Sequence, residues 1–145
     1  MTVSTLLLQA VLALCVTLGF GVLFNIPRNI LLPCGLIGIL GHVTRFSLVR
    51  LGVSNEVATF CGALVVGLIG YGTARQLGSP RLVFTVTGII SMVPGIPAYE
   101  TVIYFTRGDI LDGLQSAVRA GLITAAIAVG LSTARILTEL DLSSR

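Results

Sequence analysis

The chain has 145 residues, of which 54% are hydrophobic and only 10% are charged, and its mean hydropathy is +1.01. Soluble domains carry roughly 25% charged residues, so this composition excludes a soluble domain and indicates one integral membrane domain, residues 1–145. The formal net charge is +3, but the basic residues are single, scattered arginines without interleaved aromatic residues. This pattern argues against nucleic acid as a partner.

Five apolar segments are long enough to cross a lipid bilayer, which requires about 20 residues in a helix. In chain order they cover approximately residues 3–24, 29–49, 55–77, 82–105 and 110–138. The first has the length of a complete crossing, so we interpret it as an uncleaved helix rather than a signal peptide. The sequence therefore predicts an all-α bundle of about five transmembrane helices.

The arginines are distributed unequally between the two sides of this predicted bundle. One side would carry Arg28, Arg75, Arg81, Arg135 and Arg145. The other side has Arg50 and Arg107, which are offset by Glu56, Asp109 and Asp112. The positive-inside rule then places the N-terminus outside and the C-terminus in the cytoplasm. Arg119 and Arg135, near the two ends of the last segment, are expected to be interfacial anchors.

Small residues line one face of two predicted helices. They are Ala63, Gly67, Gly70 and Ala74 in the third segment, and Ala117, Gly121, Thr124, Ala128 and Ser132 in the fifth. Such stripes let helix backbones approach closely in lipid. They predict tight packing, either within the chain or against another subunit, including a second copy of the chain.

The fourth segment contains Pro94-Gly95-Ile96-Pro97, which should interrupt its helix. Neither proline can donate a backbone hydrogen bond, and Gly95 has the freedom to let the chain unwind. The free carbonyl and N–H groups at such a break must face protein, water or a solute. Many transporters hold their substrate at a broken helix. The alternative is a proline kink whose carbonyls are satisfied by Ser, Thr or neighbouring helices.

Polar residues accompany the break. At ideal helical periodicity, Thr87, Ser91, Pro94, Ala98 and Thr101 share one face, which suits a small polar solute. Glu100 follows closely, and a carboxylate inside the membrane is costly and functional by default. Glu100 is therefore a candidate for a solute- or proton-linked role; the alternative is a position near the interface, where water would make the charge cheap.

A second polar position lies in the second segment, where His42 and Arg45 share a face with Gly38. Arg45 either extends outward to the interface or turns inward and offers a fixed charge to a carboxylate. In the inward case His42 would be a titratable neighbour, for substrate binding or for coupling.

Templates for enzymes and metal sites do not fit this sequence. There is no Walker lysine, no Gly-x-Ser-x-Gly and no His-Glu-x-x-His motif. Cys15, Cys34 and Cys61 lack the spacing of metal ligands, and we interpret them as small buried hydrophobic residues. We therefore expect no catalytic activity, no cofactor and no metal.

The sequence contains three further motifs, which are LFNIP (Leu23–Pro27), GHVTR (Gly41–Arg45) and FTVTGIISMVPGIPAY (Phe84–Tyr99). They resemble the threonine/serine exporter family, in particular the small subunit of its split, two-component form. The similarity covers nearly the whole chain, and its most specific part is the Pro-Gly-x-x-Ala-Tyr core. By motif correspondence the resemblance marks Asn25, Pro27, Gly41, His42, Arg45, Pro94, Gly95, Ala98 and Tyr99. Glu100 lies outside the matching part.

The resemblance implies a secondary transporter of the bacterial inner membrane. It would export small amino acids such as threonine and serine, or a dicarboxylate such as succinate, together with a larger subunit of the same family. A zwitterion needs one cationic and one anionic subsite, whereas a dicarboxylate needs two cationic ones. The other hypothesis is a membrane scaffold that does not transport and only positions a larger partner.

The candidate substrate-binding residues combine both lines of argument. They are Ser91, Pro94, Gly95, Pro97, Ala98, Tyr99, Thr101, His42 and Arg45, with Glu100 and His42 as possible coupling residues.

Overall fold

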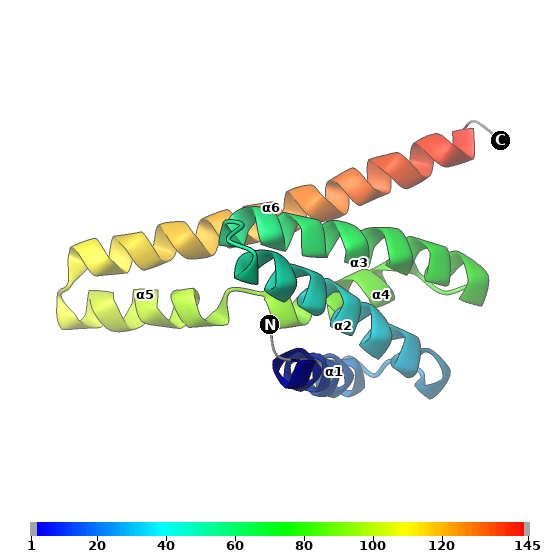
Figure 1. The fold of residues 1–145 in the computed structure, drawn as a ribbon, viewed down its shortest axis with the longest axis horizontal. Helices are drawn as coiled ribbons and strands as arrows, with labels where there is room; N and C mark the ends of the chain where they lie inside the picture. Colours follow the sequence, from blue (N-terminus) through cyan, green and yellow to red (C-terminus); the bar gives the residue numbers. More distant parts are fainter. Residues whose placement is uncertain (1–2, 144–145) are drawn as a thin grey trace.

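The computed structural model describes residues 3–143, all secondary structure in this range being helical. The helices are α1 (Val3–Leu23), α2 (Arg28–Arg50), α3 (Asn55–Leu77), α4 (Arg81–Ile89), α5 (Gly95–Arg107) and α6 (Ile110–Ser143), with a 3-10 turn η1 (Ile90–Met92) between α4 and α5 (Figure 1). Four helices are long and apolar enough to cross a membrane. Arg81–Met92 and Gly95–Arg107, which are bent by 55° at a short break, pass the same test together and give a fifth candidate crossing. The predicted all-α membrane fold with a broken fourth span is confirmed.

The helix ends follow from the residues between them. Gly78 and Gly108 adopt left-handed conformations, with φ of 60° and 85°, and end α3 and α5. Glycine takes this conformation without steric cost, which makes it the usual residue after a helix. Pro27 and Pro80 directly precede α2 and α4, where a missing N–H costs little. Short connections therefore keep successive helices adjacent.

Close backbone contacts bring α2, α3 and η1 together. A Cβ added at Gly62 of α3 would lie 2.8 Å from the carbonyl oxygen of Gly41 in α2 and 2.8 Å from Sδ of Met92 in η1. Met92 is fully buried. Helix association in lipid depends on such van der Waals contacts between small residues. The two glycines thus create the space in which Met92 holds η1 against α2 and α3.

The predicted small-residue face of α3 is an internal packing surface. Ala63, Gly67, Gly70 and Ala74 are all buried. A Cβ at Gly130 of α6 would lie 2.9 Å from Cβ of Ala63, so α3 and the second half of α6 are in close contact. The corresponding face of α6 is different, because Gly121, Thr124, Ala128 and Ser132 are exposed. Of the three cysteines Cys34 is buried, but Cys15 is exposed, so the expectation of a buried side chain is wrong for Cys15.

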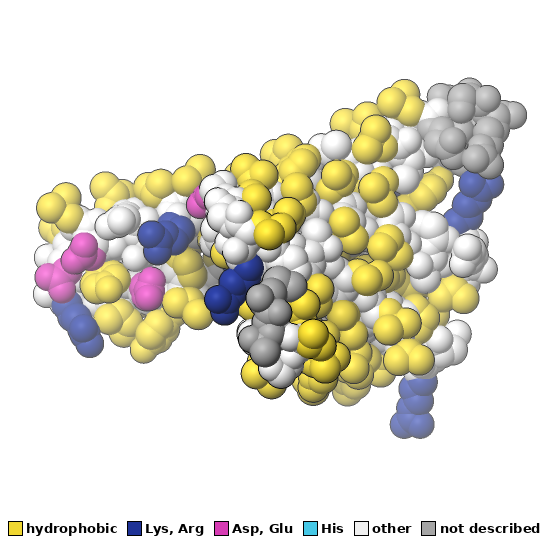
Figure 2. Space-filling view, in the orientation of Figure 1, with side chains coloured by type: hydrophobic (Ala, Val, Ile, Leu, Met, Phe, Trp, Pro, Cys, Tyr) yellow, Lys and Arg dark blue, Asp and Glu magenta, His cyan; other side chains and the backbone are white. Residues whose placement is uncertain are grey.

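We call α1–α4, η1 and residues 122–143 the bundle, and α5 with residues 110–121 the hairpin. The hairpin projects away from the bundle, and α5 lies alongside the first half of α6 (Figure 1). None of the α5 residues is buried. Figure 2 shows apolar side chains over much of the visible face and acidic side chains gathered towards the end of the hairpin. Arg145, expected on the basic side of the bundle, lies outside the described residues.

Candidate functional site

The structure divides the predicted site residues into two groups. His42, Arg45 and Ser91 lie in the bundle, on α2 and η1. Pro97 to Thr101 lie on α5, beyond the 55° bend. The single polar face expected from Ser91 to Thr101 is therefore interrupted, because a bend of this size turns α5 away from the helix before it. The first group forms a polar cluster inside the bundle.

Arg45 is half-buried and reaches from α2 to the first residue of α3. Its Nη2 donates a hydrogen bond to Oδ1 of Asn55 on α3, at 2.9 Å. One turn earlier, Nε2 of His42 lies 2.9 Å from Oε1 of Gln9 on α1. These four residues line a pocket of about 240 Å³ with Phe46 and Val49. Side chains from three helices thus meet at a site whose only charged member within residues 3–143 is Arg45.

The cluster contains polar atoms that remain unpaired. Nδ1 of His42, Nε of Arg45 and Oγ of Ser91 are buried and have no hydrogen-bond partner among the described residues. Buried polar groups without partners are costly and uncommon in native proteins. Arg45 also has no acidic partner in the described part of the chain, and a buried, uncompensated charge costs more than a neutral group. The arrangement therefore suits an anionic ligand that accepts hydrogen bonds.

Local packing explains why these side chains meet. Because Gly62 has no side chain, α3 approaches α2 closely, and a Cβ at this position would lie 3.3 Å from Cβ of Arg45. This proximity brings Asn55, two turns earlier on α3, within reach of the guanidinium group. Met92 packs against Gly41 and Gly62, so the preceding residue of η1, Ser91, also lies at this crossing. Glycines at the crossing thus assemble the cluster.

At the break itself, the unwound residues are Val93 and Pro94. Both have non-helical ψ angles, of 133° and 62°. Gly95 already begins α5 and has no positive φ, so unwinding does not depend on the freedom of this glycine as expected. The Gly95 N–H donates to the carbonyl of Val93 at 2.8 Å, and the Ala98 N–H donates to the carbonyl of Pro94 at 3.1 Å. Part of the polar backbone at the break is therefore satisfied locally.

The α5 residues face a different environment. Tyr99 is 67% exposed and Ala98 is also exposed. Thr101 Oγ1 donates to the carbonyl of Pro97 at 2.7 Å, which satisfies a backbone group of its own helix. Glu100 is half-buried and forms no ion pair with the described residues. Among the described residues, no side-chain hydrogen bond or ion pair joins these residues to the cluster around Arg45.

Three other residues of the matching motifs lie at helix ends or at a helix crossing. Asn25 has a left-handed φ of 55° after α1, Pro27 precedes α2, and Gly41 forms the crossing with α3. Sequence reasoning missed Gln9 and Asn55 as members of the cluster. The available signal was weak: Gln9 is an isolated amide in an apolar segment, and Asn55 begins another segment. Their roles depend on contacts between helices, which a single segment does not reveal.

A family profile described as "Threonine/Serine exporter, ThrE" matches residues 9–137. The match includes α2 and α3, the break, and every residue of the polar cluster. No solved structure matches the chain. The matched range covers most of the 145 residues, so the chain is a multi-pass membrane protein that belongs to the threonine/serine exporter family, whose members are transporters.

Proposed function

We propose that this chain is the smaller subunit of a secondary exporter for threonine and serine in the bacterial inner membrane. Its N-terminus would lie outside and its C-terminus in the cytoplasm, in agreement with the distribution of arginines. The observation that carries the proposal is Arg45, a cation turned into the bundle without an acidic partner among the described residues. Ionisable residues inside a membrane protein commonly mark a solute or ion pathway.

In this proposal Arg45 binds the carboxylate of the solute. Nη2 of Arg45 already bonds to Asn55, which fixes the side chain and leaves Nε free to donate. The free hydroxyl of Ser91 adds a second hydrogen-bonding group, and His42 supplies a titratable group for proton coupling. Pro94, Gly95 and Pro97 retain a role as the break that exposes backbone groups near the end of the pathway.

The proposed larger subunit would cover surfaces that the chain leaves open. The 13 residues of α5 extend about 20 Å, which is less than the roughly 30 Å hydrocarbon thickness of a bilayer. On α6, the small residues Gly121, Thr124 and Ala128 face outward. A second helix can approach such a face closely. Ala98, Tyr99 and Glu100 on α5 would then line a path completed by the partner or by a second copy of the chain.

Succinate is the second candidate substrate, and a scaffold without transport is the alternative function. Succinate needs two cationic subsites, whereas the cluster offers Arg45 and a titratable His42. A scaffold does not require an uncompensated charge in its interior, so Arg45 favours a transporter.

The test is an export assay in cells that lack both this chain and the larger subunit. Cells complemented with both wild-type subunits should export threonine and serine faster than uncomplemented cells, with succinate compared in parallel. Gly95→Leu should assemble normally, because a Cβ at this position meets nothing within 4 Å, yet it should abolish export if the break lines the pathway. Full export by Gly95→Leu would show that the break is not part of the substrate site. The absence of any export with normal assembly would favour the scaffold.

A further inference from the structure

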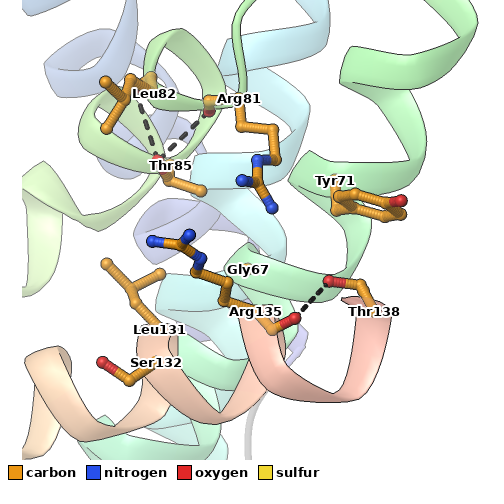
Figure 3. A pocket seen from close by; sticks show the side chains of 9 residues that line it. All are labelled: Gly67, Tyr71, Arg81, Leu82, Thr85, Leu131, Ser132, Arg135 and Thr138. Carbon is orange, nitrogen blue, oxygen red and sulfur yellow. Dashed lines mark hydrogen bonds between the residues drawn. The ribbon is translucent and has the colours of Figure 1, made fainter. Parts of the chain in front are cut away.

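A second pocket, lined by apolar residues and by Arg81 and Arg135, lies between α3, α4 and α6, at the end of the bundle where α3 connects to α4. Its volume is about 340 Å³, within the roughly 300–1,000 Å³ of small-molecule sites. Figure 3 shows the guanidinium groups of Arg81 and Arg135 extending into the space between α4 and α6. In the proposed orientation this end faces the cytoplasm. None of its residues belongs to the cluster around Arg45.

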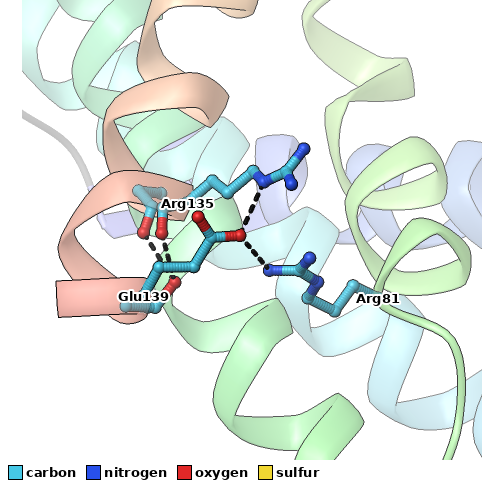
Figure 4. Close-up of polar contacts among 5 residues, drawn as sticks. Arg81, Arg135 and Glu139 are labelled. Atoms are coloured by element: carbon cyan, nitrogen blue, oxygen red, sulfur yellow. Dashed lines mark hydrogen bonds and ion pairs between the residues drawn. The ribbon is translucent and has the colours of Figure 1, made fainter. Parts of the chain in front are cut away.

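Glu139 does not line the pocket itself, but it brings a negative charge to the two arginines that do. Oε1 of Glu139 lies 2.8 Å from Nε of Arg135 and 3.7 Å from Nη1 of Arg81 (Figure 4). All three side chains are substantially exposed, at 42% to 66%, and exposed ion pairs contribute little to stability. Glu139 can therefore rearrange when a ligand enters. One carboxylate shared by two guanidinium groups also leaves hydrogen-bonding capacity on both arginines.

Neighbouring groups fix and extend the site. The guanidinium carbon of Arg81 lies 5.7 Å from the centre of the Tyr71 ring, a cation–π contact that orients the arginine. The hydroxyl of Thr85 donates to carbonyls of its own helix, at 3.2 and 3.4 Å, which leaves its oxygen free to accept a hydrogen bond. Ser132 also lines the pocket. The hydroxyl groups of Thr85 and Ser132 therefore lie near the two arginines and their partner Glu139.

We propose that this pocket is a second binding site for a small zwitterionic amino acid on its way to export. The ligand carboxylate binds between Arg81 and Arg135, its ammonium group binds Glu139, and a side-chain hydroxyl bonds to Thr85 or Ser132. A dicarboxylate fits less well, because its second carboxylate would meet Glu139. This inference rests on the proposed function and adds an entry site to it. A phosphoethanolamine lipid headgroup shares the same charges and is the competing source of the ligand.

The test measures binding of radiolabelled threonine to the full chain in phosphatidylglycerol nanodiscs. The background is Arg45→Gln, so that binding reports the second pocket alone. We expect saturable binding that falls at least tenfold in affinity in Arg81→Gln and in Arg135→Gln. Arg28→Gln, which removes the same charge at the start of α2, should bind as well as the background. Circular dichroism and gel filtration confirm that each variant is folded.

Glu139→Gln separates the two halves of the proposed ligand. It should weaken threonine binding and strengthen the binding of 3-hydroxybutyrate, which keeps the carboxylate and hydroxyl groups but lacks the ammonium group. A merely structural role for Glu139 would weaken both ligands equally and would overturn its assignment to the ammonium group.

Further results would separate a lipid ligand from an amino-acid ligand, and a failure of this second site from a failure of the proposed function. If threonine does not bind, and phosphatidylethanolamine raises the melting temperature of the background protein but not of Arg81→Gln, the pocket is a lipid site and the inference is wrong. If the Arg81→Gln and Arg135→Gln subunits, each with Arg45 intact, export threonine at the wild-type rate, the second site is also wrong, although the proposed function stands. The absence of threonine and serine export by the wild-type pair would overturn the proposed function itself.

Discussion

The bundle and the hairpin are built from the same apolar and small residues but bury them to different extents. In the bundle, glycines such as Gly41 and Gly62 bring backbones into contact, and polar groups are drawn inside. In the hairpin, Gly95 and Gly121 face open space, and all α5 side chains are at least partly exposed. Similar composition thus gives a self-contained packing unit in one region and an open surface in the other.

The largest effect is expected where a glycine lies against a backbone. Gly62→Leu places a side chain against the Gly41 carbonyl and Met92. Overpacking typically costs about 1–3 kcal/mol, and a rigid backbone cannot move aside, so we expect little folded protein by gel filtration. The matched control is Gly72→Leu on the same helix, where a Cβ meets nothing within 4 Å. Equal yields of the two variants would contradict the assigned crossing.

The next comparison uses side-chain truncation in each region. Met92→Ala removes a fully buried side chain from η1 and should cost about 2–5 kcal/mol. This should appear as a lower melting temperature in detergent. Ile96→Ala on α5 removes a side chain that is 74% exposed, and we expect a change within about 0.5 kcal/mol. A larger loss at Ile96 would mean that the hairpin is packed more tightly than its exposure indicates.

The export rate should fall more when the cluster around Arg45 is changed than when an α5 residue is changed. Arg45→Gln removes the charge proposed to bind the carboxylate, and we expect export to fall at least about tenfold, the equivalent of 1.4 kcal/mol. Glu100→Gln, in the hairpin, should lower export less than Arg45→Gln does, because Glu100 lines only the part of the path shared with the partner and forms no ion pair with the described residues. Rates from the complemented cells decide between these outcomes. A severe loss in Glu100→Gln alone would move the functional centre to the hairpin.

The smallest effect on stability is expected at Gly121. Because a Cβ here meets nothing within 4 Å, Gly121→Leu should melt within about 0.5 kcal/mol of the wild type but should no longer co-purify with the larger subunit. Gly19→Leu on α1 has equally open surroundings and provides the control. If both variants retain the partner, the outward face of α6 is a lipid surface rather than an interface.

Features encoded within one segment could be predicted from the sequence. The prolines and glycines between helices separate the spans, and Pro94 with Pro97 predicts the break, because a missing N–H acts within one helical turn. The position of the unwound residues was less predictable. Gly95 had the required freedom, but the chain unwinds at Val93 and Pro94 and uses Gly95 as the first residue of α5.

Features that depend on other helices could not be predicted. Between Ala120 and Leu131, α6 carries apolar or small residues on every side, so its sequence does not distinguish a face that contacts protein from one that contacts lipid. The buried face contains Ile123, Ile127 and Ala134, not the stripe that includes Gly121. Gln9 and Asn55 join His42 and Arg45 only through the packing of three helices. Likewise, the 55° bend, which separates Ser91 from Thr101, is a property of the assembled chain.

The continuity of α6 has a mechanical consequence for the break between α4 and α5. Its 34 residues form one uninterrupted helix, about 51 Å long, that belongs to the hairpin at one end and to the bundle at the other. Two segments, the connection from α4 to α5 and the helix α6, therefore attach the hairpin to the bundle, and the helix is interrupted only in the first of them. Swinging the hairpin about Val93 and Pro94 must either bend α6 or turn it as a rigid lever. If α6 turns as a rigid body, a movement of the hairpin at the break also displaces Arg135 and Glu139 at the opposite end of the helix.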